Sequence, residues 1–343
     1  MALDKEKKQQ IEECKDKDGK IIDIPPYIMK MTQEKADEYF EKNKTDNSRM
    51  LSDYSPDERN HIREHSTHLN TSDERLQIRK DILLDMIKGK SPAGEDGRQK
   101  QYLIVGPANA GKTTTRALLD SDEKIDNPEL EAIHEQYKKD TKPEHTASFK
   151  FGEMRKKIPE FKDADKKFEK DMYGLIRSEV SGLHQAFEEF AKDVGLTIVG
   201  EQLMDIDVRK SDEINNKVQN SDLTVIATTA SPEKLLERNQ KRKDRGENTM
   251  SDSELTSTIK GCSAPHANEE LLKMAKKGIL LDTNQEKSQT ILTANEGEVQ
   301  VHNSRALIKF RKNEDYGKSQ NYTELVQRSS GGRDLNVEHL YGR

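Results

Sequence analysis

Apolar residues along the middle of this 343-residue chain occur in two alternating patterns. Short apolar runs end just before Gly106 and Gly200 and recur at residues 223–227 and 278–282, which is typical of strands buried on both faces. Over residues 165–194 the apolar positions instead recur every three or four residues and predict a long amphipathic helix. Strands alternating with helices predict an α/β fold, a parallel sheet with helices on both faces.

Further elements are predicted from shorter signals. An isoleucine between charged residues predicts a short second strand at residues 124–126, and a polar, lysine-rich insertion follows at residues 138–162. Alternation over residues 290–310 predicts a β-hairpin at the edge of the sheet. Before the first strand, helical spacing and start signals predict helices over residues 33–43, 57–66 and 72–89.

The flanks of the chain are more polar than its centre. Hydrophobic residues make up 31% of the chain and charged residues 36%, which favours one packed core with polar material around it. We therefore predict three parts: a polar helical N-terminal extension (1–95), an α/β domain (96–312) and a mostly flexible tail (313–343).

Composition also bears on partners and location. The net charge of −6 gives no reason to expect a nucleic-acid partner. The start of the chain lacks the apolar segment of a signal peptide, and no apolar run is long enough to cross a bilayer. We expect a cytoplasmic protein without membrane contact, with secretion as an effector lacking a cleavable signal left open. Cys14 and Cys262 offer no disulfide framework or metal-binding spacing, which fits a reducing compartment.

A phosphate-binding loop follows the first predicted strand. The residues from Gly106 to Thr113 read G-x-x-x-x-G-K-T, between a candidate buried strand and a candidate helix. Glycines permit the torsions that turn successive amides toward a phosphate, and Lys112 can reach the β- and γ-phosphates. The Thr113 hydroxyl can ligate Mg²⁺. The residues expected to bind nucleotide are Gly106, Pro107, Ala108, Asn109, Ala110, Gly111, Lys112, Thr113 and Thr114.

Acids close to predicted strand ends are the next candidates. Ligands of a parallel sheet bind at the carboxyl ends of its strands, which draws attention to Asp126, Glu129 and Glu201. Asp126 or Glu129 could accept the proton of a substrate hydroxyl, although an acid in this position also serves as an ordinary helix cap. Glu201 suits an acid that orients a metal-bound water or a substrate hydroxyl. Asp282 lies on the last predicted strand and is interpreted as structural.

A cationic helix is predicted to begin at Ser231-Pro232-Glu233. Lys234, Arg238 and Arg242 follow at intervals of four, so they share one face. Phosphoryl transfer needs positive charge over the transferred group, which a lid of arginines supplies. The alternative interpretation is a solvated helix face.

One further motif points to metal chemistry. His61-Ile62-Arg63-Glu64-His65 matches H-x-x-E-H, and the two histidines would share a helix face. The surrounding residues are polar or charged and nothing marks a third ligand, so we interpret this stretch as a solvated helix.

Residues 101–310 resemble the zeta toxin family of P-loop kinases. The resemblance is carried by the loop, by Ile125-Asp126-Asn127-Pro128-Glu129-Leu130, by Val199-Gly200-Glu201-Gln202 and by the helix with Arg238 and Arg242. It implies an ATP- and Mg²⁺-dependent kinase that phosphorylates the 3′-hydroxyl of UDP-N-acetylglucosamine or another small hydroxylated acceptor. It also implies an antitoxin or host protein as a partner.

The resemblance implies a role for particular residues. Lys112 and Thr113 would bind phosphate and Mg²⁺, Glu201 would orient substrate, and Arg238 would be the first lid arginine, with Arg242 or Arg245 as the second. The family carries its catalytic base where this chain has Pro128, so Asp126 or Glu129 would have to replace it.

Two other classes of protein compete with the kinase interpretation. A GTPase would carry Asn-Lys-x-Asp after the fourth strand, and Ala227-Thr228-Thr229-Ala230 does not supply it. A nucleotide-binding effector or regulatory module with altered or lost kinase activity is the second, and Pro128 favours it.

Overall fold

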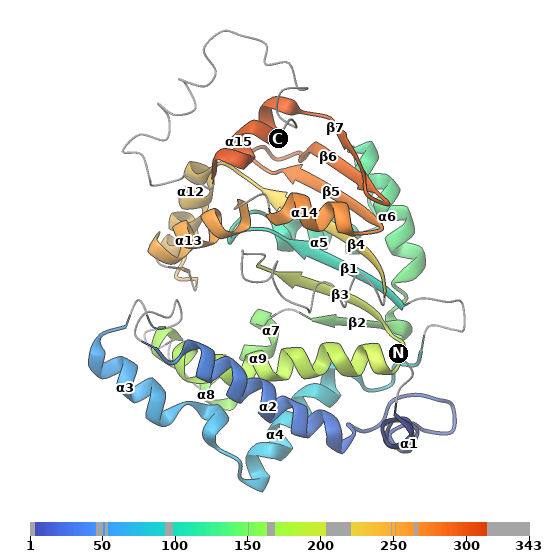
Figure 1. The fold of residues 1–343 in the computed structure, drawn as a ribbon, viewed down its shortest axis with the longest axis vertical. Helices are drawn as coiled ribbons and strands as arrows, with labels where there is room; N and C mark the ends of the chain where they lie inside the picture. The colour runs from blue at the N-terminus through green and yellow to red at the C-terminus, as the bar shows by residue number, and fades with distance from the viewer. Residues whose placement is uncertain are drawn as a thin grey trace.

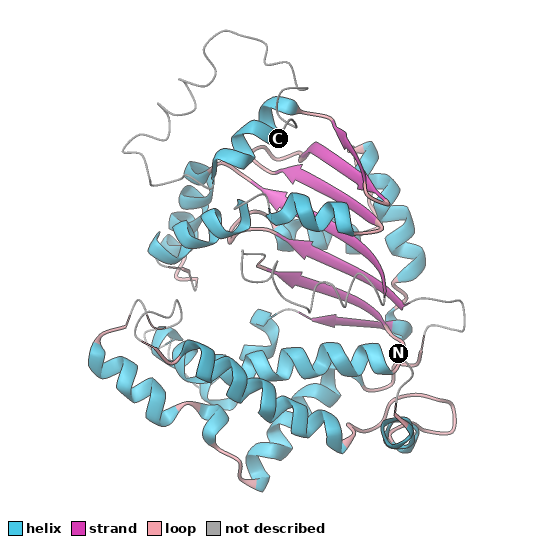
Figure 2. Cartoon of the chain, in the orientation of Figure 1, coloured by secondary structure: helices cyan, strands magenta, loops and turns pink. Residues whose placement is uncertain are grey.

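A mostly parallel sheet runs through the computed structural model of the protein (Figure 1; Figure 2). The structure describes residues 4–45, 51, 54–92, 99–149, 151–162, 169–203, 221–247, 249–250, 252–263 and 267–313. The strands are β1 (Gln99–Val105), β2 (Thr146–Phe149), β3 (Thr197–Gln202), β4 (Ser221–Thr229), β5 (Lys277–Asp282), β6 (Gln289–Asn295) and β7 (Glu298–Val301). Their order is β2-β3-β1-β4-β5-β6-β7; the first five are parallel, and β6 and β7 are antiparallel additions at one edge.

Helices precede the sheet, connect its strands and follow it. Those before the sheet are α1 (Lys5–Glu13), α2 (Pro26–Asn43), α3 (Pro56–His65), η1 (Thr67–Leu69) and α4 (Asp73–Ile87). The others are α5 (Lys112–Asp120), α6 (Pro128–Asp140), η2 (Pro143–His145), α7 (Phe151–Lys156), α8 (Pro159–Lys162), α9 (Glu169–Asp193), α12 (Pro232–Asp244), α13 (Asp252–Ser263), α14 (Ala267–Met274) and α15 (Ser304–Lys312).

Both faces of the central strand β1 are buried, which explains its unbroken apolar run. Leu103 and Val105 pack in a cluster with residues of α14 and α15, while Tyr102 and Ile104 pack on the other face with residues of α5 and α6. Successive side chains of a strand point to opposite faces, so both faces of β1 must be apolar. The predicted α/β fold with helices on both faces is confirmed.

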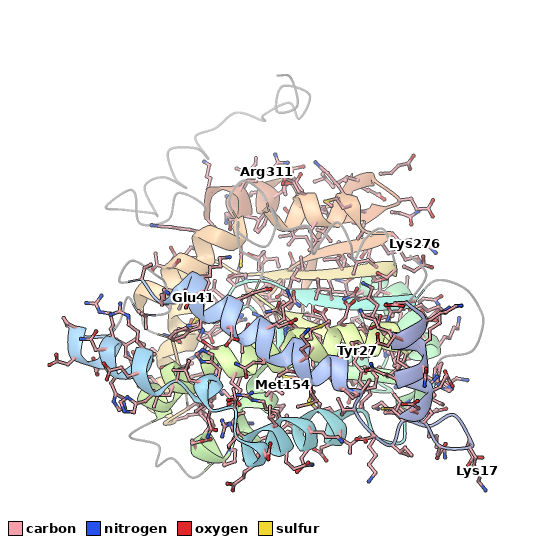
Figure 3. The ribbon with its side chains drawn as sticks, turned by 60° about the horizontal axis from the view of Figure 1, so that its bottom comes forward. Lys17, Tyr27, Glu41, Met154, Lys276 and Arg311 are labelled. Atoms are coloured by element: carbon pink, nitrogen blue, oxygen red, sulfur yellow. The ribbon has the colours of Figure 1, made fainter. Side chains whose placement is uncertain are left out.

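The helices before the sheet share a hydrophobic core with α9. Ile28 of α2 and Leu83 of α4 cluster with Ile176 and Phe187 of α9 and with β2 and β3. Figure 1 shows α2 lying along α9, and Figure 3 shows α2 from another side, with Tyr27 and Glu41 near its two ends. A Cβ on Gly182 would lie 2.3 Å from the Thr32 carbonyl oxygen, so glycine permits this close approach. The division at residue 95 stays a prediction, and the extension packs as part of the core.

A buried ionic cluster joins α4 to α9. Glu179 is 0% exposed and accepts hydrogen bonds from Nε of Arg75 at 2.8 Å and from Nε of Arg79 at 2.6 Å. Burial by itself would raise the pKa of Glu179, but the hydrogen bonds and charges of the two arginines outweigh it and lower that pKa. Arg75 also holds Glu160 with two bonds of 2.7 and 2.9 Å.

The structure differs from three of the predicted segments. Residues 124–126 form no strand, because the Ile125 amide bonds to the Glu131 side chain at 3.0 Å and its side chain packs with α5 and α6. The second strand of the chain is β2, inside the stretch predicted to be a polar insertion. The edge hairpin ends at Val301, and the rest of the predicted hairpin is α15, which Asn303 caps by accepting from the Ala306 amide.

Two predicted helices and the paired histidines can be located in the structure. The predicted helix over residues 165–194 is confirmed as α9 and the one over residues 72–89 as α4. His61 and His65 are exposed on α3 with ring centroids 4.3 Å apart, and the described residues hold no group of three or more His, Cys, Asp or Glu that could bind a metal. Among the described helices none is long and apolar enough to cross a membrane. Residues 314–343, most of the predicted tail, lie outside the described residues.

The ionic cluster generates a prediction about stability. Glu179→Gln removes the charge that two buried arginines share, so we expect the free energy of unfolding to fall by about 3 kcal/mol. Because the pKa of Glu179 is lowered on folding, this contribution is present above the unfolded pKa and is lost as pH falls through the folded one. Urea unfolding at pH 7 and at acidic pH measures both. Glu153→Gln, which breaks an exposed ion pair with Lys156, is the control; equal stability of the two variants would contradict the prediction.

Candidate active site

The loop between β1 and α5 has the backbone of a phosphate cradle. Gly106, Asn109 and Gly111 have positive φ angles of 146°, 62° and 85°, and α5 begins at the next residue, Lys112. A Cβ on Gly106 would lie 2.2 Å from the Thr228 carbonyl oxygen, so the loop starts pressed against β4. Positive φ angles and the free amides of a helix N-terminus together form an anion-binding concavity.

The Lys112 side chain folds back onto the start of this loop. Its Nζ donates to the carbonyl oxygens of Gly106 at 2.9 Å and Pro107 at 2.7 Å, so the ammonium is enclosed while part of the side chain stays accessible. Burial lowers the pKa of Lys112 to about 8, although Cys262 and Glu201 act to raise it. The lysine therefore carries its charge at neutral pH, beside the concavity that the amides form.

Thr113, the residue after Lys112, lies beside Glu201 of β3. The Thr113 hydroxyl donates to Oε2 of Glu201 at 2.9 Å. The parallel register pairs Glu201 with Ile104, so the carboxylate is on the α5 face of the sheet. A hydroxyl and a carboxylate are the hard oxygen ligands that Mg²⁺ accepts together with phosphate and water. The two residues therefore fit a magnesium site completed by a nucleotide.

The arginines of α12 reach the same loop. Ser231 caps the helix by accepting from the Lys234 amide, and Pro232 begins it, as predicted. Arg238 donates to the Asn109 carbonyl at 3.0 Å, and Arg242 donates to the Asn109 side-chain oxygen at 3.0 Å. Burial lowers the pKa of Arg238, and Glu237 and Asp282 act to raise it.

Two lysines of α12 pair with an acid of the same helix and do not contact the loop in the described structure. Lys234 and Lys241 both pair with Glu237, at 2.9 and 2.6 Å, and these side chains are at least one-third exposed. The structure thus divides the cations of α12 into two groups, and the arginine lid stays a prediction. Arg238 and Arg242 contact the loop, and the lysines form a solvated surface.

Asp126 and Glu129 lie elsewhere at the carboxyl edge of the sheet. Asp126 is 70% exposed and pairs with Lys287, whose hydrogen bond and charge lower the pKa of the aspartate. Glu129 accepts from the Thr290 hydroxyl at 3.2 Å and lies 3.5 Å from Nδ1 of His302. Their described contacts are with the β5–β6 connection and the edge hairpin, whereas Glu201 contacts the loop.

Sequence reasoning missed two residues of the site. Thr283, directly after β5, donates its hydroxyl hydrogen toward the Ala110 and Thr229 carbonyls, each 3.0 Å away, and accepts from Arg238 at 3.2 Å. Cys262 of α13 is buried close enough to act on the pKa of Lys112. The rule that ligands bind after strand ends could have found Thr283, but nothing in the sequence marks Cys262.

A pocket of about 490 Å³ adjoins this edge of the sheet. Its lining includes Ser231 and Asn284, which hydrogen-bond to each other, and Arg305 and Lys309 of α15. The loop, Lys112, Arg238 and Arg242 are not among the residues that line it.

A parallel sheet with a G-x-x-x-x-G-K-T loop curled between its central strand and the following helix defines a P-loop nucleotide-binding fold. No protein-family model and no curated protein matches the chain. A crystal structure of AvrRxo1-ORF1 with AvrRxo1-ORF2 and sulphate ions is similar, with a TM-score of 0.50 and 13% identity over 85% of this chain and 83% of that chain.

Two more structures were found at lower scores. The AvrRxo1-ORF1:-ORF2 pair with ATP has a TM-score of 0.48 and 14% identity over 81% of each chain. A structure of the PezAT toxin–antitoxin system of Streptococcus pneumoniae has a TM-score of 0.46 and 11% identity over 80% of this chain and 95% of that chain. At such identity the comparisons speak to fold alone. The shared fold agrees with the expected resemblance to the zeta toxin family.

The loop geometry generates a prediction. Gly106→Ala places a Cβ against the Thr228 carbonyl, so the loop must move and we expect binding of Mg-ATP, measured by calorimetry, to be lost. Gly152→Ala is the matched control, because an added Cβ there meets nothing within 4 Å and alanine favours the helix. If Gly106→Ala bound Mg-ATP as tightly as the control, the described loop would not be the binding site.

Proposed function

We propose that the protein is an ATP- and Mg²⁺-dependent phosphotransferase of the zeta toxin type. It transfers the γ-phosphate to a hydroxyl of a small acceptor, a nucleotide sugar such as UDP-N-acetylglucosamine. The observation that carries the proposal is the convergence of Lys112, Thr113, Glu201, Arg238 and Arg242 on one phosphate loop. These are a cation, a metal-ligand pair and two guanidinium groups, the groups that phosphoryl transfer requires.

Each group has a part in the transfer. The acceptor hydroxyl oxygen forms a bond to the γ-phosphorus, the bond to the β,γ-bridging oxygen breaks, and ADP leaves with the electron pair. Lys112 holds the β- and γ-phosphates, and Arg238 and Arg242 neutralise the charge that develops on the transferred group. Thr113 and Glu201 would hold a Mg²⁺, which would supply positive charge to the phosphate oxygens.

The hydroxyl proton must pass to a base. Asp126 and Glu129 remain candidates, and each would have to exchange its present contacts, with Lys287 and with Thr290 respectively, for contact with the acceptor. Glu201 is the acid whose described contact lies on the loop. We propose that Glu201 orients the metal and the acceptor, and that its loss is the most damaging of the three.

A second candidate function rests on one observation. Where the zeta toxins carry their base, this chain has Pro128, and the flanking Asp126 pairs with Lys287. This arrangement favours a nucleotide-binding effector or regulatory module with altered or lost kinase activity. Such a protein would bind Mg-ATP without turnover.

A protein partner is part of the proposal. The AvrRxo1-ORF1 structure that shares the fold holds a second protein, AvrRxo1-ORF2. By analogy we propose an antitoxin or a host protein as a partner of this chain. We place its action in the cytoplasm, or in a host cell after secretion.

Incubation with Mg-ATP and a panel of nucleotide sugars tests the activity. We expect release of ADP and an acceptor heavier by one phosphoryl group, both abolished in Lys112→Ala and kept in Lys139→Ala, an exposed lysine of α6. Mg-ATP binding without either product would favour the second candidate. Absence of binding would exclude both.

The three acids generate a second test. With an acceptor in hand, Glu201→Gln should lower kcat by about 100-fold, because it weakens the metal and orienting contacts at the loop. Asp126→Asn and Glu129→Gln should each cost less, and the one that costs more is the stronger candidate for the base. An undiminished kcat in Glu201→Gln would remove that residue from the mechanism.

The pKa of Lys112 predicts a pH dependence. Because burial lowers this pKa to about 8, the unliganded protein loses the ammonium charge as pH rises through 8. Phosphate restores the charge, so ATP binding above pH 8 should weaken and take up a proton. Calorimetry between pH 7 and 9.5 in buffers of different ionisation enthalpy measures both effects. Lys112→Arg stays charged and should show neither; a dependence identical in both proteins would assign it to another group.

A further inference from the structure

Thr283 links three parts of the site that come from different strands. Its amide donates to the Thr229 carbonyl at 2.8 Å, which ties the residue after β5 to the end of β4. Its carbonyl oxygen accepts from Arg238. Its hydroxyl lies 3.0 Å from the Ala110 carbonyl oxygen of the loop, and the residue is only 7% exposed. A buried threonine whose three polar groups all bond to elements of one site is placed to set their geometry.

The contact with Ala110 bears on the direction of one loop amide. The Ala110 carbonyl and the Gly111 amide belong to the same planar trans peptide, so they point in opposite directions. Holding the carbonyl toward Thr283 therefore turns the Gly111 N–H away from Thr283. Gly111 has a φ of 85°, and its nearest neighbour, for a Cβ built there, is the Thr283 methyl group at 3.5 Å. Thr283 thus confines this peptide with both its hydroxyl and its methyl group.

The same hydroxyl also touches the lid. Oγ1 accepts from Arg238 at 3.2 Å while its own hydrogen is shared between the Ala110 and Thr229 carbonyls. An acceptor at this point orients the guanidinium that also binds the Asn109 carbonyl. One hydroxyl therefore connects the phosphate cradle with the arginine expected over the transferred phosphate.

We propose that Thr283 is a positioning residue that aims the Gly111 amide and Arg238 at the phosphates of the bound nucleotide. The proposal rests on the proposed function, which takes the nucleotide to be ATP and places Arg238 over its phosphates. In this role Thr283 acts through the loop and the lid. Its loss should therefore weaken nucleotide binding more than it weakens the fold.

Calorimetry with Mg-ATP tests this role. Thr283→Val removes the hydroxyl and keeps a branched side chain, so we expect about tenfold weaker binding, and Thr283→Ser, which keeps the hydroxyl, should recover most of it. Thr283→Ala guards against the case in which the second methyl group of valine is too large, and it should also bind about tenfold more weakly. Thr146→Val is the matched control. Thr146 is a buried threonine of β2, and its hydroxyl donates to the Lys142 carbonyl at 2.8 Å.

The outcomes separate the two proposals. Weaker binding in valine and alanine variants with an unchanged thermal unfolding midpoint, and rescue by serine, supports the positioning role. Equal binding by wild type, Thr283→Val and Thr283→Ala overturns it and leaves the proposed function intact. Weaker binding that serine does not rescue, or that Thr146→Val shares, also overturns it. A wild-type protein that does not bind Mg-ATP overturns the proposed function itself.

Discussion

The site depends on one backbone constraint, the tight turn by which the chain leaves β1 and enters α5. The turn needs left-handed torsions at Gly106 and Gly111 and no side chain where Gly106 meets the Thr228 carbonyl. Amides turned inward in this way bind an anion without any change in their own conformation. The neighbouring strand ends hold the turn in place, since β4 presses on its start and Thr283 after β5 bonds to its far side.

Strand register then decides which side chains reach the loop. Because Glu201 pairs with Ile104, it lies on the α5 face, beside Thr113. A shift of one residue would turn Glu201 to the opposite face, where the α9 side of the sheet lies. On the other side of β1, the cap at Ser231 sets where α12 begins, and two arginines one turn apart both meet Asn109. The positive charge over the loop therefore comes from helix geometry.

The helices before the sheet help to hold β3, the strand that carries Glu201, from the opposite face. Their apolar residues and the residues of α9 form one cluster that extends to β2 and β3. Within it, Glu179 is shared by Arg75 and Arg79, a pairing that costs desolvation and tolerates few alternative arrangements. Phe149 of β2 packs where a side chain on Gly200 would lie, next to Glu201. The support of this strand end thus reaches from the first helices to the site.

Much of the fold could be predicted from local sequence patterns. The loop, its strand and its helix are contiguous, and their torsional and apolar requirements are written in consecutive residues, so G-x-x-x-x-G-K-T and the α/β class could be predicted. Period 3.6 over a long stretch likewise determined α9. The site residues near the loop in sequence, Lys112 and Thr113, followed for the same reason.

Tertiary structure decided the rest. Ile125 resembles a strand residue in its local sequence, but packing between α5 and α6 and a bond to Glu131 keep it out of the sheet. β2 is too short and polar to stand out, and it becomes a strand because α9 covers it. The apolar spacing after Asn303 is compatible with a strand or with a helix. Asn303 caps a helix by accepting from the Ala306 amide, and the segment forms α15. Thr283 lies more than 170 residues from Ala110, and only the adjacency of strand ends brings them together, which no local pattern encodes.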